Sequence, residues 1–147
     1  MENARLLLNA GADLYATGPD GIKDGVHMIN AAIVEHRTDL AELILDSEAQ
    51  GKYGDKAIMR EALTIATFRR QPDTIDLLLS KGADINGTNS AGQTALHVAA
   101  KTGYLQTVKL LVSHGADRSI RDKVGKTAAD YTADWPNKPE LAQTVKF

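Results

Sequence analysis

Cysteine is absent from this 147-residue chain. The protein therefore forms no disulfide, and it offers neither a thiolate ligand for a metal nor a cysteine nucleophile. Long apolar runs are also missing, since no segment approaches the roughly 20 apolar residues that cross a bilayer. The first residues carry an acid at position 2 and a run of only three leucines, so we expect no signal peptide. These absences predict a protein without a membrane partner, located in the cytoplasm or, alternatively, in the nucleus.

A surplus of charge of either sign is lacking as well. Lys and Arg number 17 and Asp and Glu 19, which gives a net charge of -2. A field this weak gives no electrostatic reason to expect nucleic acid as a partner. The hydrophobic content of 43% and the charged content of 24% are typical of a soluble protein, and 147 residues suffice for one domain with its own core.

An internal repeat is present instead. The tripeptide Gly-Ala-Asp occurs at 11–13, 82–84 and 115–117. The last two copies are 33 residues apart, and the first two are 71 apart, which is two such periods plus five residues. A decayed copy at 40–50 fills the gap, because its Leu43 and Ile44 align with the leucine pairs of the other copies. The period predicts one domain, 1–147, of repeated units: a partial unit at 1–13, then 14–50, 51–84, 85–117 and a C-terminal cap at 118–147.

The unit at 85–117 shows how each copy is expected to fold. Its apolar residues fall at helical spacing in two segments, Leu96, Ala99 and Ala100 in the first and Leu105, Val108, Leu111 and Val112 in the second. Gly103 separates the segments and suits a helix C-terminus, where a left-handed backbone is required. We therefore expect each unit to be a helix, a tight turn, a second helix and an extended loop.

The segment Thr94-Ala95-Leu96-His97-Val98-Ala99 resembles the T-P-L-H-x-A core of an ankyrin repeat, with Ala in place of Pro. The resemblance is strongest over 77–131, and Thr127 to Asp130 resemble the same core in a C-terminal cap. It implies an all-α solenoid of helix-turn-helix units with β-turn or hairpin fingers. It also implies that Thr94 and His97 form hydrogen bonds within their turn and to the backbone of the neighbouring repeat.

A reactive role for the histidines is the alternative. A general base needs a nucleophile or substrate proton nearby, and no nucleophile motif is present. No two histidines lie four residues apart on a helix, the spacing typical of metal binding; the four are His27, His36, His97 and His114. We expect no catalytic residue, no metal site and no cofactor.

Two units depart from the family pattern. The positions equivalent to Thr94–His97 read Glu61-Ala62-Leu63-Thr64 in one unit and His27-Met28-Ile29-Asn30 in the other, so both lack the Thr and His pair. Gly11 and Gly25 are 14 positions apart, whereas Gly115 and Gly125 are 10 apart. The loop before Gly25 is therefore longer than its counterpart by four residues.

The resemblance implies a protein or peptide partner that meets the finger tips and the concave side of the first helices. The tip positions are Ser90, Ala91, Lys123 and Val124, with the enlarged loop Thr17–Asp24 beside them. The first-helix positions are Phe68, Arg69, Gln71, Lys101, Thr102 and Tyr104, with Val34, Glu35 and Arg37 as equivalents in the preceding unit. We expect Phe68 and Tyr104 to be neighbours flanked by Arg69 and Lys101. A Phe68 that packs inward, between helices, is the open alternative.

These observations favour a non-catalytic protein-interaction module. Two other functions stay open: an enzyme or enzyme subunit with a site near the loop Tyr15–Gly25, and an architectural segment of a larger protein. Residues 2–10 read as a second helix without its first, which favours a fragment of a longer array and a monomer over a dimer formed through that edge. At the other end, Pro136 predicts that the last inner helix stops near Trp135, and Pro139 suits the start of a final helix, Glu140–Val145.

Overall fold

The computed structural model describes residues 24–46 and 56–146. Within these ranges the chain is all-α, with helices and turns and no strand. The elements are α2 (Asp24–Val34), α3 (Thr38–Asp46), α5 (Lys56–Phe68), α6 (Pro72–Ser80), α7 (Ala95–Thr102), α8 (Leu105–Ser113), α9 (Ala128–Tyr131), the 3₁₀ turn η1 (Thr132–Asp134) and α10 (Pro139–Val145). Except for its last two residues, the loop expected at Tyr15–Gly25 lies outside the described residues, as does the unit expected at 1–13.

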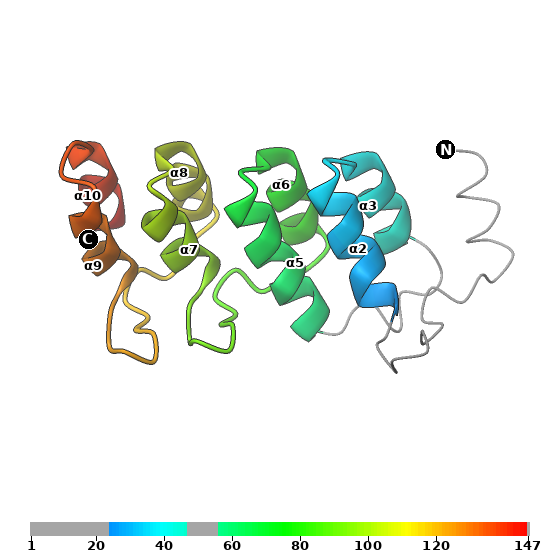
Figure 1. The fold of residues 1–147 in the computed structure, drawn as a ribbon, viewed down its shortest axis with the longest axis horizontal. Coiled ribbons are helices and arrows are strands. Elements are labelled where there is room, and N and C mark those ends of the chain that lie inside the picture. The colour runs from blue at the N-terminus through cyan, green and yellow to red at the C-terminus, as the bar shows by residue number, and fades with distance from the viewer. Residues whose placement is uncertain (1–23, 47–55, 147) are drawn as a thin grey trace, which may run out of the picture.

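The helices form two rows, which run side by side along the molecule (Figure 1). The first row holds α2, α5, α7 and α9, each in contact with the next. The second row holds α3, α6, α8 and α10, and each of these packs on the first-row helix of its own pair. The loops from α6 to α7 and from α8 to α9 extend from the same side of the stack. The helix pairs therefore follow one another in chain order.

Small residues let the first-row helices approach closely. Ala62, Ala66 and Ala99 have no exposed surface, and Ala95 and Ala100 are buried with them. Larger side chains fill the space between the rows, and those without exposed surface include Ile33, Ile44, Ile75, Leu78, Leu96, Val108 and Leu111. Each such aliphatic side chain contributes about 1.5–3 kcal/mol of burial free energy. The core is therefore a continuous strip between the rows.

The turns inside the first three helix pairs, from α2–α3 to α7–α8, each have one residue with a left-handed backbone. His36, Arg70 and Gly103 occupy this position, with φ of 56°, 60° and 72°. In each turn the next residue donates its N–H back into the first helix, as Gln71 does to the carbonyl of Ala66 at 3.0 Å. Of these three turns, the α7–α8 turn has glycine, and a Cβ on Gly103 would lie 2.6 Å from the ring of Trp135. The close approach of Trp135, added to the backbone conformation, explains glycine at this turn.

The C-terminal segment packs against the α7–α8 turn. As predicted from the prolines, α9 and η1 end before Trp135, and α10 begins at Pro139. The Trp135 indole N–H donates to the carbonyl of Lys101 at 3.2 Å, and the Lys138 ammonium donates to that of Gly103 at 2.9 Å. These two donors satisfy carbonyl groups that the end of α7 leaves without helical partners. Leu141 of α10 is fully buried where α10 contacts α8.

Candidate functional site

His97 links its own turn to the next loop. The ring is 1% exposed, its Nδ1 accepts the backbone N–H of Thr94 at 3.2 Å, and its Nε2 lies 3.0 Å from the carbonyl oxygen of Lys126. A carbonyl only accepts hydrogen bonds, so Nε2 carries the proton and donates it. The hydrogen bonds expected for Thr94 and His97 are thereby confirmed. Both ring nitrogens are occupied, which leaves His97 no lone pair for a substrate proton or a metal.

The two loops described between helix pairs share one geometry. The side-chain oxygen of Asn89 accepts the N–H groups of Ala91 and Gln93, and Asp122 accepts those of Val124 and Lys126 in the same way. The N–H of Lys123 donates to the carbonyl of Ala91 at 3.0 Å, which joins the loops. The expected tip residues Ser90, Ala91, Lys123 and Val124 are all exposed, and Val124 is 74% exposed. The tips therefore form a pair of adjacent, accessible turns.

Asp122 also anchors its loop to α9, a contact that the sequence reasoning missed. The Tyr131 hydroxyl donates to the Asp122 carboxylate at 2.5 Å, and the Gln93 amide donates to the Tyr131 hydroxyl oxygen at 3.2 Å. This hydroxyl lowers the pKa of Asp122 to about 2, with the N–H of Lys126 assisting. The same bond raises the pKa of Tyr131. The sequence signal was the change from Asn89 to Asp at the equivalent position 33 residues later.

A groove of about 630 Å³ runs over the first row of helices, and we call it the face groove. It is lined by Val34, Thr64, Ile65, Phe68, Arg69, Gln93, Val98, Lys101 and Thr102. Phe68 is 61% exposed at this groove, so it does not pack inward. Of the first-helix residues expected here, the structure brings together Phe68, Arg69, Lys101 and Thr102. Ile65 lies one helical turn before Phe68, and Val98 lies one turn before Lys101 at the equivalent position 33 residues later. Both line the groove, and neither was predicted from the sequence.

Gln71 does not belong to this surface. Its side chain is 6% exposed, its amide donates to the carbonyl of Ile33 at 2.5 Å, and its amide oxygen accepts the hydroxyl of Thr74 at 3.0 Å. The expectation that Gln71 faces a partner is therefore wrong. The reason is its place at the start of α6, where the side chain bridges the Ile33 carbonyl of α2 and the Thr74 hydroxyl of α6.

Tyr104 has the equivalent position one repeat later, and it is not a neighbour of Phe68 in one groove. It lines a separate groove of about 540 Å³, together with Arg70, Pro72, Leu105, Gln106, Thr107 and Leu110. The guanidinium of Arg70 lies 3.3 Å from the centre of the Tyr104 ring. The expected strip of Phe68 and Tyr104 is thus divided between two grooves that share no lining residue.

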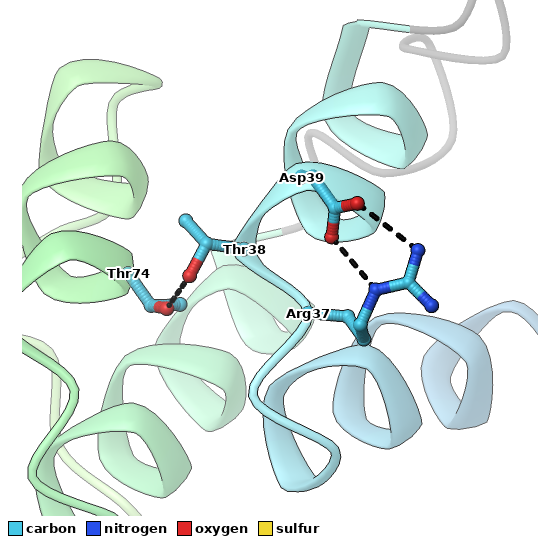
Figure 2. A network of polar contacts seen from close by, with 4 residues as sticks. All are labelled: Arg37, Thr38, Asp39 and Thr74. Atoms are coloured by element: carbon cyan, nitrogen blue, oxygen red, sulfur yellow. Dashed lines mark hydrogen bonds and ion pairs between the residues drawn. The ribbon is translucent and has the colours of Figure 1, made fainter. Parts of the chain in front are cut away.

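The equivalent positions on the α2–α3 pair differ among themselves. Val34 lines the face groove and is 37% exposed, and Glu35 is exposed. Arg37 forms a two-pronged ion pair with Asp39, with N···O distances of 2.9 and 3.0 Å (Figure 2). This pair lowers the pKa of Asp39, and it is exposed, where ion pairs contribute little to stability.

A comparison with protein-family models identifies the same repeated helix pairs. Residues 63–145 match the model of the family described as ankyrin repeats in three copies, which is more than half of the chain. The chain belongs to the ankyrin-repeat family. A search of curated proteins found no match. Ankyrin repeats are generally protein-interaction modules, and the family is typically non-catalytic.

The described part of this ankyrin-repeat chain shows two further features. None of its helices is long and apolar enough to cross a membrane. Residues 24–46 and 56–146 contain no group of three or more His, Asp or Glu arranged to hold a metal ion. What the arrangement offers is a broad, partly apolar face with basic side chains at its edge.

Proposed function

We propose that this chain is a non-catalytic recognition module that binds a protein or peptide partner in the face groove. The supporting observation is Phe68, a phenylalanine 61% exposed beside a groove that Val34 and Val98 also line. An exposed aromatic costs free energy in water, and covering it with a partner contributes about 2 kcal/mol. Aromatic and arginine side chains are also the commonest anchors of protein interfaces.

Charge adds to this anchor. Arg69 and Lys101 are exposed at the face groove, and neither forms an ion pair with a carboxylate of the described residues. They remain available to a partner. We propose that Phe68, Arg69, Lys101 and Thr102 contact the partner from the groove. The same partner would meet the loop tips, where Ser90, Ala91, Lys123 and Val124 are exposed.

We further infer that the stacked pairs form an ankyrin solenoid, with the loops at 86–94 and 119–127 as its fingers. The hydrogen bond from Lys123 to Ala91 supports this inference, because it holds the loops side by side. We propose that the chain acts as a monomer in the cytoplasm. Light scattering over a dilution series should then give one constant mass of 15.8 kDa.

Capture from a cell lysate tests the recognition role. Phe68→Ala should reduce retention of the bound partner about tenfold or more, because truncating an aromatic anchor costs an interface roughly 1–2 kcal/mol or more. Its melting temperature should fall by only a few degrees, since the ring is largely exposed.

Two further variants complete this experiment. Lys109→Ala, on the exposed side of α8, is the matched control and should retain the partner fully. Val124→Ala reports whether the loop tip contributes. Equal retention by the unmodified chain and by Phe68→Ala would contradict the role of the face groove. A large fall in the melting temperature of Phe68→Ala would show that Phe68 stabilises the fold instead.

A further inference from the structure

The second row of helices contains two junctions that differ at equivalent positions. Between α3 and α6 the junction is closed by hydrogen bonds. The hydroxyls of Thr38 and Thr74 lie 2.9 Å apart (Figure 2), and Thr74 also donates to Gln71, whose amide reaches Ile33. The polar side-chain groups of Thr38, Thr74 and Gln71 therefore hydrogen-bond to one another and to the backbone of α2.

Between α6 and α8 the equivalent residues are Pro72, Tyr104 and Thr107, in place of Thr38, Gln71 and Thr74. Pro72 has no hydroxyl, so the link between threonines cannot form. The groove of about 540 Å³ that Tyr104 lines is found here, and we call it the seam groove. Pro72, Leu105 and Leu110 give it an apolar surface.

Arg70 is the cation of the seam groove. Its guanidinium carbon lies 3.3 Å from the centre of the Tyr104 ring, a cation–π contact that holds the charge at the groove. No lining residue is acidic, and Arg70 forms no ion pair with a carboxylate in the described part of the chain. The groove therefore presents one positive charge without an internal counter-charge.

Thr107 is the second polar feature. It lines the groove although its residue is only 6% exposed, and its hydroxyl has no hydrogen-bond partner among residues 24–46 and 56–146. In the described residues, the fully buried side-chain oxygen without a partner is Oδ1 of Asn30, so the Thr107 hydroxyl is open to the groove. From there it can donate to a carbonyl or carboxylate group of a ligand.

We propose that the seam groove is a second binding site, which takes an acidic segment of a partner protein. An aliphatic or aromatic side chain of that segment lies against Pro72, Leu105 and Leu110, and an adjacent carboxylate pairs with Arg70. Arginine and carboxylate match in geometry and form two parallel hydrogen bonds, which makes charge complementarity specific here. The site is independent of the face groove, since the two share no lining residue.

Selection from a library of random short peptides displayed on phage tests this site. The target is the full chain carrying Phe68→Ala, so that the face groove lacks its aromatic anchor. Enriched peptides should carry an aliphatic or aromatic residue next to Asp or Glu. When they are added as synthetic peptides, the backbone amide resonances of Thr107 and Leu110 should shift in NMR spectra.

Adjacent arginines provide the matched variants. In the Phe68→Ala chain, Arg70→Gln should lower the affinity of the selected peptides about tenfold or more, which is the loss expected for a charge-assisted pair. Arg69→Gln changes a residue of the face groove and should leave their affinity unchanged. Circular dichroism melting of both variants checks that each is folded.

Three results would overturn the proposal: no enrichment over the same selection on Phe68→Ala/Arg70→Gln, enriched peptides without an acidic preference, or peptides that bind Arg70→Gln and Arg69→Gln equally. None of these results bears on the face groove, whose own test uses Phe68→Ala in the otherwise unmodified chain. A failure of either site is therefore distinguishable from a failure of the other.

Discussion

Thr74 and Thr107 are the same residue at the same position of successive helix pairs, yet they differ in what surrounds them. Thr74 has no exposed surface, and its hydroxyl is bonded to both Gln71 and Thr38. Thr107 is nearly as buried, and no hydrogen bond of its hydroxyl is found in the described residues. The repeat thus preserves the residue while the neighbours at 72 and 104 change, and a closed junction becomes a groove.

The junction between α7 and α9 gives a third arrangement. There the link lies at the loop end, where His97 reaches the carbonyl of Lys126, and Gln93 and Tyr131 meet Asp122. Successive helix pairs are therefore joined by different polar contacts over one continuous apolar core. Stability is expected to depend on these contacts locally, as in repeat proteins whose units interact only with their neighbours.

His97 should give the largest loss of stability. His97→Ala removes the links to Thr94 and Lys126 and leaves a cavity where the buried ring was, so we expect the free energy of unfolding to fall by about 3 kcal/mol. Urea denaturation measures this change. Within the described residues, the hydroxyl of the equivalent residue Thr64 bonds to the carbonyl of Arg60 in its own helix, and Thr64→Ala should cost about 0.5 kcal/mol. Equal losses for both variants would contradict a special role of His97 between pairs.

The two threonines should respond in opposite directions. Thr74→Val keeps the shape and removes the hydrogen bonds to the Gln71 amide oxygen and the Thr38 hydroxyl, so we expect a loss of about 1–2 kcal/mol. Thr107→Val removes a hydroxyl that has no partner in the described chain, so we expect no loss or a gain of about 0.5 kcal/mol. Thermal unfolding of both variants beside the unmodified chain measures the contrast. A loss for Thr107→Val as large as for Thr74→Val would mean that both hydroxyls are equally engaged.

How far the sequence predicts these features depends on the range of the contacts. Apolar spacing predicts the helix pairs, and the prolines predict the stop before Trp135, because both effects act within a few residues. Thr94 and His97 were placed by resemblance to a known turn. The burial of Gln71 was missed, because it depends on a hydrogen bond to the carbonyl of Ile33, 38 residues earlier in the chain.

In the candidate site, too, features that depend on distant contacts could not be predicted from the sequence. Exposure of Phe68 was one of two alternatives that helical spacing left open, since its position lies at the edge of the buried stripe. The separation of Tyr104 from Phe68 follows from the turn at Gly103, which carries Tyr104 toward α8. The pair of Asp122 and Tyr131 joins a loop to a helix, and no local pattern reports which tyrosine a buried aspartate will meet.

The smallest effect concerns pH, and it separates the charged link at Asp122 from the uncharged one at Thr74. The pKa of Asp122 is lowered from 3.8 to about 2, chiefly by the Tyr131 hydroxyl. A carboxyl whose folded pKa is depressed stabilises the fold fully above its unfolded pKa, and this contribution is lost as pH falls toward the folded value.

Tyr131→Phe removes the largest cause of that shift, so the pKa of Asp122 should return toward its ordinary value. The stability difference between the unmodified chain and Tyr131→Phe should then be widest above about pH 4 and narrow as pH falls to about 2. The lowered pKa values of Asp39 and Asp117 are present in both proteins and cancel in this difference. Thr74→Val, whose contacts carry no charge, should show a constant difference over the same range. Urea denaturation at several pH values measures both, and parallel pH profiles for Tyr131→Phe and the unmodified chain would show that the hydroxyl of Tyr131 does not control the ionisation of Asp122.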